Sequence, residues 1–242
     1  MEDIERIHMA IEAIFFDLDN TLLDFNRAER AALQKVLPGY GITPTPEVLA
    51  RYHELNDYHW KQLELGNLTR EQVMQYRFDR LLEELGVSGD GARVSDAYEN
   101  QLAAGENFYI EGARELLDDL KEKYMLCLAT NGAAHVQRLR LHNSGLDKDF
   151  AHIFISEELG ADKPAAAFYD VCFAALPGIK REETVMVGDS LTSDIKGGKA
   201  AGMRTVWYCP KGQRRPAQEQ MAAIPDKIIE TLGELKTILA IG

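Results

Sequence analysis

The chain has 242 residues, of which 45% are hydrophobic and 27% are charged, and its formal net charge is −12. This length and composition suffice for one large globular domain or for a domain with an insertion, and they exclude disorder as the dominant state. The acidic balance argues against a nucleic-acid polymer or an anionic membrane surface as the main partner, because both require basic patches. A small anionic substrate at one local site remains compatible with it.

The sequence also bears on cellular context. No hydrophobic run approaches the roughly 18 residues of a membrane span, and residues 1–10 lack the basic start and apolar stretch of a signal peptide. Cys127, Cys172 and Cys209 are far apart and show no CxxC spacing, which argues against a disulfide framework and against a zinc site. We therefore expect a cytoplasmic protein.

Short runs rich in β-branched and aromatic residues predict five β-strands. They lie at residues 11–16, 124–129, 153–155, 184–187 and 205–208. Amphipathic segments that separate most of them predict helices at residues 111–123, 133–143 and 165–176. Strands that alternate with helices indicate βαβ units, so we expect an α/β fold with a Rossmann-like core, in which helices cover both faces of a mainly parallel sheet.

One long block interrupts this alternation. Residues 26–105 contain no convincing strand, and helical patterns occupy residues 27–37, 46–65, 69–85 and 92–104. Thr69 and Gln72 fit a capping box. Because the block is too long for a simple crossover, we expect an inserted all-helical domain at residues 26–105, a core formed by residues 1–25 and 106–242, and an active site in the cleft between them.

Polar side chains follow the predicted strands at the points where the strands end. In an open parallel sheet, ligands bind outside the carboxyl ends of the strands, so we expect these side chains to meet at one edge. A lysine after the third strand and an acid just beyond the fourth complete the group. The residues are Asp17, Asp19, Thr130, Lys163, Asp189 and Asp194.

The charges of this group require a cation. Four aspartates in one crevice repel one another, and Lys163 offsets only one of their charges. Oxygen-only ligands indicate a hard ion, and Mg²⁺ is the usual choice where few carboxylates share the coordination with water and phosphate. A hydroxyl, a lysine and loop amides beside the ion would cradle a phosphate, and an aspartate free to attack phosphorus would form an aspartyl-phosphate.

Four segments, in this order, resemble the four motifs of the haloacid dehalogenase (HAD) superfamily. They are Asp17-Leu18-Asp19-Asn20-Thr21, Thr130-Asn131-Gly132, Lys163-Pro164 and Gly188-Asp189-Ser190-Leu191-Thr192-Ser193-Asp194. The helical block after the first motif resembles the C1 cap of that superfamily, so the resemblance covers nearly the whole chain. It implies a HAD-like core with the strand order 3-2-1-4-5.

The resemblance implies a catalytic role for four of these residues, which are Asp17, Asp19, Thr130 and Lys163. Asp17 would be the nucleophile and a Mg²⁺ ligand. Asp19 would protonate the leaving oxygen and later activate water, and its backbone carbonyl would bind the metal. Lys163 would neutralise charge on the nucleophile and on the phosphate.

Thr130 and the remaining motif residues would hold the phosphate and the metal. By resemblance, Thr130 and the backbone amides of Asn131 and Gly132 would bind the phosphoryl oxygens. Asp189 would bind Mg²⁺ directly, and Asp194 would act directly or through water.

The first motif and the helical block narrow the reaction. The dehalogenases of the superfamily lack an aspartate at the position of Asp19, so its presence favours phosphoester chemistry. The phosphonate-cleaving branch needs a Schiff-base lysine from the cap, where Lys35 and Lys61 do not stand out from a solvated helix face. Segments 52–60, 65–71, 77–82 and 155–164, together with Val206-Trp207, resemble a bacterial pyrimidine 5′-nucleotidase branch.

In that interpretation Asn56, Trp60 and Arg77 would touch the base or the sugar of the substrate. A core position for Trp60 and a surface position for Arg77 are at least as compatible with the sequence. The glycines Gly197, Gly198 and Gly202 suit close helix packing and a helix stop better than a phosphate loop.

The expected activity is that of a Mg²⁺-dependent phosphatase that acts through an aspartyl-phosphate on a small phosphate ester, a pyrimidine nucleoside 5′-monophosphate in the leading hypothesis. A sugar-phosphate phosphatase or a phosphomutase would use the same motifs. A phospho-aspartate signalling module is the non-enzymatic alternative, although the helical insertion suits catalysis, in which closure excludes water. The sequence leaves the oligomeric state open.

Overall fold

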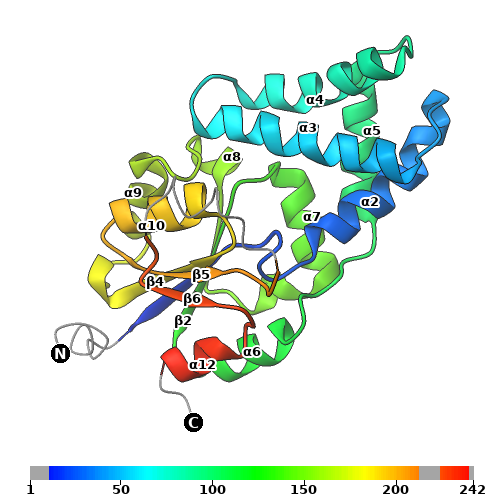
Figure 1. Ribbon diagram of the computed structural model, residues 1–242. Helices are drawn as coiled ribbons and strands as arrows, with labels where there is room; N and C mark the ends of the chain where they lie inside the picture. Colours follow the sequence, from blue (N-terminus) through cyan, green and yellow to red (C-terminus); the bar gives the residue numbers. More distant parts are fainter. Residues whose placement is uncertain (1–10, 213–223, 240–242) are drawn as a thin grey trace. The chain divides into compact units, whose positions relative to one another are not determined.

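A computed structural model describes residues 11–212 and 224–239 of the chain (Figure 1). Residues 1–10, to which the sequence-based prediction about a signal peptide refers, lie outside this range. The chain forms two compact units. The first comprises the described parts of Met1–Asp24, Tyr109–Ala134 and Ser144–Gly242, and the second comprises Phe25–Phe108 and His135–Asn143. In the part of the chain that the structure describes, no helix is long and apolar enough to span a bilayer.

The first unit contains a parallel six-stranded sheet. Its strands are β1 (Ala13–Phe16), β2 (Met125–Thr130), β3 (His152–Ile155), β4 (Thr184–Gly188), β5 (Arg204–Tyr208) and β6 (Lys227–Ile229). Their order is β3-β2-β1-β4-β5-β6, and each neighbouring pair is parallel. The expected α/β class and the order of the first five strands are confirmed, and the central strand β1 lies between β2 and β4.

The sixth strand corrects the expectation of a five-stranded sheet. β6 is only three residues long, and of these only Ile229 is buried. It pairs with β5, and the Cys209 amide donates to the Ile229 carbonyl at 2.9 Å just beyond the pairing. A segment this short has too little periodicity to distinguish it from a loop in the sequence, so the neighbouring strand rather than local propensity defines it.

Helices cover the two faces of this sheet. Figure 1 shows α9 and α10 on one side and α6 and α12 on the other. On the first side, Phe168, Tyr169 and Cys172 of α9 pack with the β1 residue Phe15 and the β4 residue Met186 in the hydrophobic core. The helices and helical turns of the unit are α6 (Ala113–Leu120), η3 (Leu146–Lys148), α8 (Ser156–Leu159), α9 (Ala166–Ala174), η4 (Arg181–Glu183), η5 (Leu191–Ile195), α10 (Lys196–Ala200) and α12 (Glu234–Ile238).

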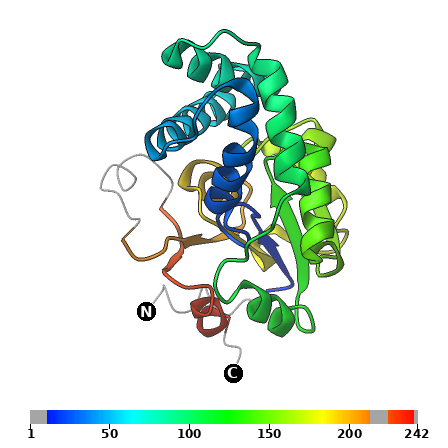
Figure 2. The same ribbon diagram turned by 90° about the vertical axis from the view of Figure 1, so that its right-hand side faces the viewer.

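The second unit is helical in its described residues. It contains α2 (Phe25–Val36), η2 (Leu37–Tyr40), α3 (Pro46–Glu64), α4 (Arg70–Leu85), α5 (Gly91–Ala104) and most of α7 (Ala134–Ser144). Figure 2 shows α2 beside α5. The four predicted helices are confirmed, as is the capping box in which Thr69 and Gln72 bond each other's backbone amides.

An aromatic cluster forms the centre of the helical unit. The rings of Tyr52 and Phe78 lie 4.6 Å apart, and the Tyr98 ring lies 5.5 Å from each of them. These side chains come from α3, α4 and α5, so one cluster joins three helices. The unit therefore has a core of its own, although α7 joins it from a distant part of the sequence. The expected boundary of a cap at residues 26–105 stays a prediction.

Candidate active site

The site begins where β1 ends. The amide of Asp17 donates to the Val187 carbonyl at 2.9 Å, which extends the β1–β4 pairing by one residue. The chain then turns back, because the amides of Leu22 and Leu23 both donate to the Leu18 carbonyl at 2.9 Å. Asn20 takes the left-handed conformation that this turn requires, with a φ of 59°, and asparagine tolerates that conformation better than most residues.

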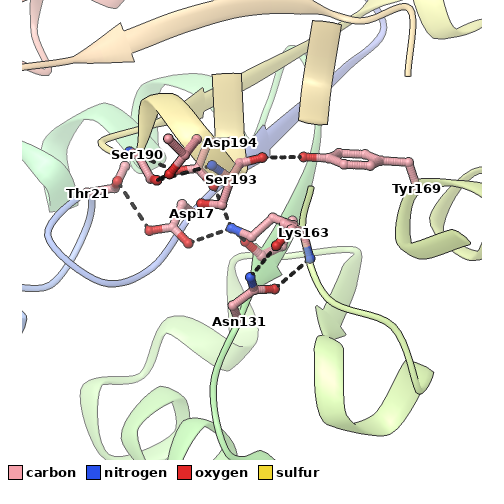
Figure 3. Close-up of polar contacts among 10 residues, drawn as sticks. Asp17, Thr21, Asn131, Lys163, Tyr169, Ser190, Ser193 and Asp194 are labelled. Atoms are coloured by element: carbon pink, nitrogen blue, oxygen red, sulfur yellow. Dashed lines mark hydrogen bonds and ion pairs between the residues drawn. The ribbon is translucent and has the colours of Figure 1, made fainter. Parts of the chain in front are cut away.

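Lys163 lies at the centre of the polar contacts (Figure 3). Its Nζ donates to Asp17 Oδ1 at 2.8 Å, to Asp194 Oδ1 at 2.6 Å and to the Ala129 carbonyl at 2.6 Å. An ammonium group has three protons to donate, so every donor of this buried lysine has an acceptor. The lysine is thereby fixed between two carboxylates that come from different strand ends.

The side chain of Asn131 holds the backbone of Lys163. The Lys163 amide donates to Asn131 Oδ1 at 2.9 Å, and Asn131 Nδ2 donates to the Lys163 carbonyl at 2.8 Å (Figure 3). The sequence suggested a role only for the Asn131 backbone amide. The paired contacts show that its side chain positions the loop that carries the lysine.

The loop after β4 delivers Asp194 into the same group. Asp194 is fully buried, and its Oδ2 accepts from the Ser190 amide at 3.0 Å. Ser190 also caps the η5 turn, since its hydroxyl accepts from the Ser193 amide at 3.2 Å. Gly188 makes this close approach possible, because a Cβ at that position would lie 2.2 Å from Asp194 Oδ2.

Three carboxylates gather around the lysine. Oxygen atoms of Asp17, Asp189 and Asp194 all lie within 4.8 Å of one another. Burial raises the pKa of Asp17 to about 7, with Asp194 and Asp19 adding to the effect and Lys163 opposing it. Burial and the charges of Asp17 and Asp194 also raise the pKa of Asp189 well above its usual range.

The lysine remains protonated in this environment. Burial alone lowers the pKa of Lys163, but the carboxylates of Asp17 and Asp194 outweigh it, so the pKa lies above its usual value. One ammonium thus faces three carboxylates, two of which have pKa values raised by burial and mutual repulsion. Such a group gains from added positive charge, and its oxygen-only donors suit a hard divalent cation.

The other expected phosphate and metal residues lie at the same sheet edge. Thr130 ends β2 and is buried, and it pairs in register with Ile155 at the end of β3. Asp19 is half-buried, and its negative charge contributes to the raised pKa of Asp17. Gly132 directly follows Asn131. The phosphate-binding and proton-transfer roles of these residues stay predictions.

The three residues expected to touch substrate from the helical unit have different surroundings. Arg77 is 3% exposed, so its expected surface position is wrong. Its guanidinium donates to Asn56 Oδ1 at 2.9 Å and to Glu99 Oε1 at 3.0 Å, and Asn56 is itself buried. Trp60 is half-buried, with the Arg70 guanidinium 5.4 Å from its ring centre. A substrate contact by these residues stays a prediction.

The glycines after η5 have the structural role expected of them. A Cβ at Gly197 would lie 2.6 Å from the Tyr169 hydroxyl, and a Cβ at Gly198 would lie 2.9 Å from Cβ of Met186. Gly202 ends the helical segment with a φ of 84°. Close packing and a helix stop therefore account for all three.

The site is that of an α/β protein in which a buried lysine contacts aspartates that follow the ends of parallel strands. A family model described as haloacid dehalogenase-like hydrolase matches residues 11–202. The chain belongs to this family, and the predicted superfamily and the prediction of an enzyme of the hydrolase class are confirmed.

Individual relatives cover almost the whole chain. HAD-hydrolase YfnB of Bacillus subtilis is 38% identical over 228 residues, which are 94% of this chain and 95% of that protein. Pyrimidine 5′-nucleotidase PynA of Streptococcus pneumoniae is 39% identical over 213 residues, which are 88% of this chain and 90% of that protein. A crystal structure of YfnB bound to magnesium matches with a TM-score of 0.88 and 37% identity, over 96% of this chain and 99% of that one.

Proposed function

We propose that this protein is a Mg²⁺-dependent phosphatase that hydrolyses nucleoside 5′-monophosphates, with a preference for pyrimidine nucleotides, through an aspartyl-phosphate. The observation that carries the chemistry is the Asp17 carboxylate beside Lys163, 2.8 Å from Oδ1 to Nζ, at the end of the central strand. The similarity to PynA over most of both chains supports the choice of substrate.

In the first half of the proposed reaction, a carboxylate oxygen of Asp17 attacks the phosphorus atom. The bond from phosphorus to the ester oxygen breaks, and Asp19 gives its proton to the departing alcohol. Lys163 offsets negative charge on Asp17 and on the transferring group. Thr130 and the amides of Asn131 and Gly132 would hold the phosphoryl oxygens, since positioning and charge neutralisation dominate phosphoryl transfer.

In the second half, Asp19 removes a proton from a water molecule that attacks the phosphorus of the aspartyl-phosphate. The bond between phosphorus and the Asp17 oxygen breaks, which releases inorganic phosphate and restores both aspartates. Asp17, Asp189, Asp194 and the Asp19 carbonyl would hold Mg²⁺. When bound, the ion supplies positive charge to a group whose three carboxylates face one ammonium.

The test is phosphate release by the purified full chain from pyrimidine and purine nucleoside monophosphates and from sugar phosphates, with Mg²⁺ and with a chelator. We expect metal-dependent release that is fastest on the pyrimidine nucleotides. Asp17→Asn should lower the rate by about 10³-fold or more, because it removes the nucleophile. Asp170→Asn, at an exposed ion pair with Arg181, is the matched control and should retain the wild-type rate.

Other outcomes would favour the alternatives. Relatives named as ribulose-1,5-bisphosphate 5-phosphatase and glyceraldehyde 3-phosphate phosphatase are 31% and 32% identical to this chain, so sugar phosphates belong in the panel. Release mainly from sugar phosphates would keep the mechanism and overturn the nucleotide preference. Migration of phosphate between hydroxyls would indicate a mutase, and a long-lived phospho-aspartate without turnover would indicate a signalling module.

A further inference from the structure

Trp207 connects the second-to-last position of β5 to the acidic group. It lies in parallel register with Gly188, the last residue of β4. Its indole Nε1 donates to the backbone carbonyl of Asp189 at 2.8 Å. The side chain is buried and packs with Leu191, Ile195 and Cys209 in a small hydrophobic cluster. A buried indole N–H needs an acceptor, and this one finds its acceptor one residue beyond the strand, at the candidate active site.

The peptide unit between Asp189 and Ser190 is held from both sides. Trp207 donates to its carbonyl oxygen, and its N–H, on Ser190, donates to Asp194 Oδ2 at 3.0 Å. The backbone direction at Asp189 is therefore fixed by contacts outside the sheet ladder. Because the Cα–Cβ bond follows the backbone, these contacts also orient the Asp189 carboxylate.

We infer that Trp207 is the positioning residue for Asp189 in the cation site, and that its fluorescence reports on the occupation of that site. The inference rests on the proposed function, because it takes Asp189 as a ligand of the cation. The Asp189 carboxylate has to stay near Asp17 and Asp194, which repel it when no cation is bound. A rigid hydrogen bond from a buried indole holds it there, as outer contacts around metal ligands do in general.

The indole lies within one hydrogen bond of a residue whose electrostatic surroundings change when a divalent cation binds. Tryptophan emission responds to nearby charge, so occupation of the site should alter the emission of Trp207. The other tryptophan, Trp60, belongs to the helical unit. Trp60→Phe therefore gives a protein with Trp207 as its single reporter.

The first measurement titrates the Trp60→Phe protein with Mg²⁺ and records the emission spectrum. We expect a saturable change with the same midpoint as the Mg²⁺ dissociation constant from calorimetry. Saturable calorimetric binding without any change in emission would overturn the reporter role.

The second measurement compares the Mg²⁺ dissociation constants of wild type and Trp207→Phe by calorimetry. We expect Trp207→Phe to weaken binding roughly 10-fold, because the phenyl ring preserves most of the packing and removes the donor. Tyr124→Phe is the matched control: it removes a hydroxyl that donates to the Leu239 carbonyl at 3.3 Å within the same unit, and it should leave the Mg²⁺ affinity unchanged.

The outcomes separate this inference from the proposed function. Unchanged affinity in a folded Trp207→Phe protein would overturn the positioning role and leave the proposed function intact. An equal loss in Tyr124→Phe would overturn it as well, since the effect would then follow general destabilisation. A wild-type protein that binds no Mg²⁺ would overturn the metal part of the proposed function and this inference together. If Trp207→Phe fails to fold, the emission titration of Trp60→Phe still decides the link between Trp207 and the site.

Discussion

At Asp17, burial acts against the ionised carboxylate that the proposed nucleophile needs. The side chain lies beside Lys163, but it also faces Asp194 and Asp19, and burial is the largest cause of its raised pKa. The neighbouring carboxylates raise the pKa of Lys163, so the lysine keeps its positive charge, whereas the raised pKa of Asp17 favours its protonated form. Burial of the ionised Asp17 carboxylate near other acids therefore lowers the stability of the folded protein, as is common at functional sites.

This opposition predicts a pH-dependent stability. The pKa of Asp17 rises from 3.8 to about 7 on folding, so the unfolded chain releases this proton at a lower pH than the folded protein does. Protonation of Asp17 therefore makes its full contribution to the free energy of unfolding below about pH 4, and this contribution is lost as the pH rises to about 7. At pH 8 and with a chelator present, the free energy of unfolding of Asp17→Asn should be about 1–3 kcal/mol higher than that of wild type, because the variant does not bury an ionised carboxylate at this position.

Urea unfolding of both proteins in the chelator, from pH 5 to pH 8, measures this difference. The advantage of Asp17→Asn should shrink toward pH 5, where the wild-type carboxyl is largely protonated in the folded state. Asp170→Asn serves as the control for loss of an acid at an exposed ion pair. A variant less stable than wild type at pH 8 would show that the contact with Lys163 outweighs burial and repulsion.

At the scale of elements, the junction of β4 and η5 sets the geometry of the site. Strand β4 ends at Gly188 and is followed directly by Asp189. The η5 turn then places Asp194 beside the end of the strand. A side chain at residue 188 would occupy the space of the Asp194 carboxylate, since its Cβ would lie 2.2 Å from Oδ2. The turn can close only on a glycine.

Gly188→Ala should therefore displace Asp194 and loosen its contact with Lys163. We expect a loss of about 2–4 kcal/mol in the free energy of unfolding, since the clash involves a buried carboxylate with fixed partners. Gly233→Ala is the matched control, because a Cβ there meets nothing within 4 Å. Thermal unfolding measures both effects. Equal stability of the two variants would mean that η5 can move away without loss.

The elements differ in how far the sequence could predict them. Strands β1, β2, β4 and β5 are predictable because their buried residues form continuous apolar runs, as expected for a sheet covered on both faces. The helix α4 is predictable because its capping box is local. β6 is not predictable, since it is three residues long and its position depends on its pairing with β5.

The candidate site shows the same division. Asp17, Lys163, Asp189 and Asp194 could be placed together from their positions after strands in a parallel sheet, and the structure brings them together. The contacts that position them could not be inferred. The hydrogen bonds of the Asn131 side chain to the Lys163 backbone and of the Trp207 indole to the Asp189 carbonyl join segments that are far apart in the sequence. Local periodicity carries no information about such contacts.

At the scale of the whole molecule, the chain divides its stability between two cores. The sheet unit is centred on apolar strands, whereas the helical unit combines an aromatic cluster with a buried charge. Arg77 lies within that cluster, with its guanidinium 5.3 Å from the Tyr98 ring centre, and it joins α4 to α3 and α5 through Asn56 and Glu99. Its loss would remove hydrogen bonds that join three helices of one unit only.

Arg77→Met should consequently destabilise the helical unit by about 2–4 kcal/mol, because it removes the hydrogen bonds that the buried guanidinium donates to the buried side chains of Asn56 and Ser95. Hydrogen exchange followed by mass spectrometry distinguishes the units, since peptides from α3, α4 and α5 should lose protection while those from β1 and β4 retain it. Arg80→Met, an exposed arginine of the same helix paired with Glu83 and Glu84, should change little. Equal loss of protection in both units would show that the two cores unfold as a single cooperative structure, and the buried arginine would then stabilise the whole chain.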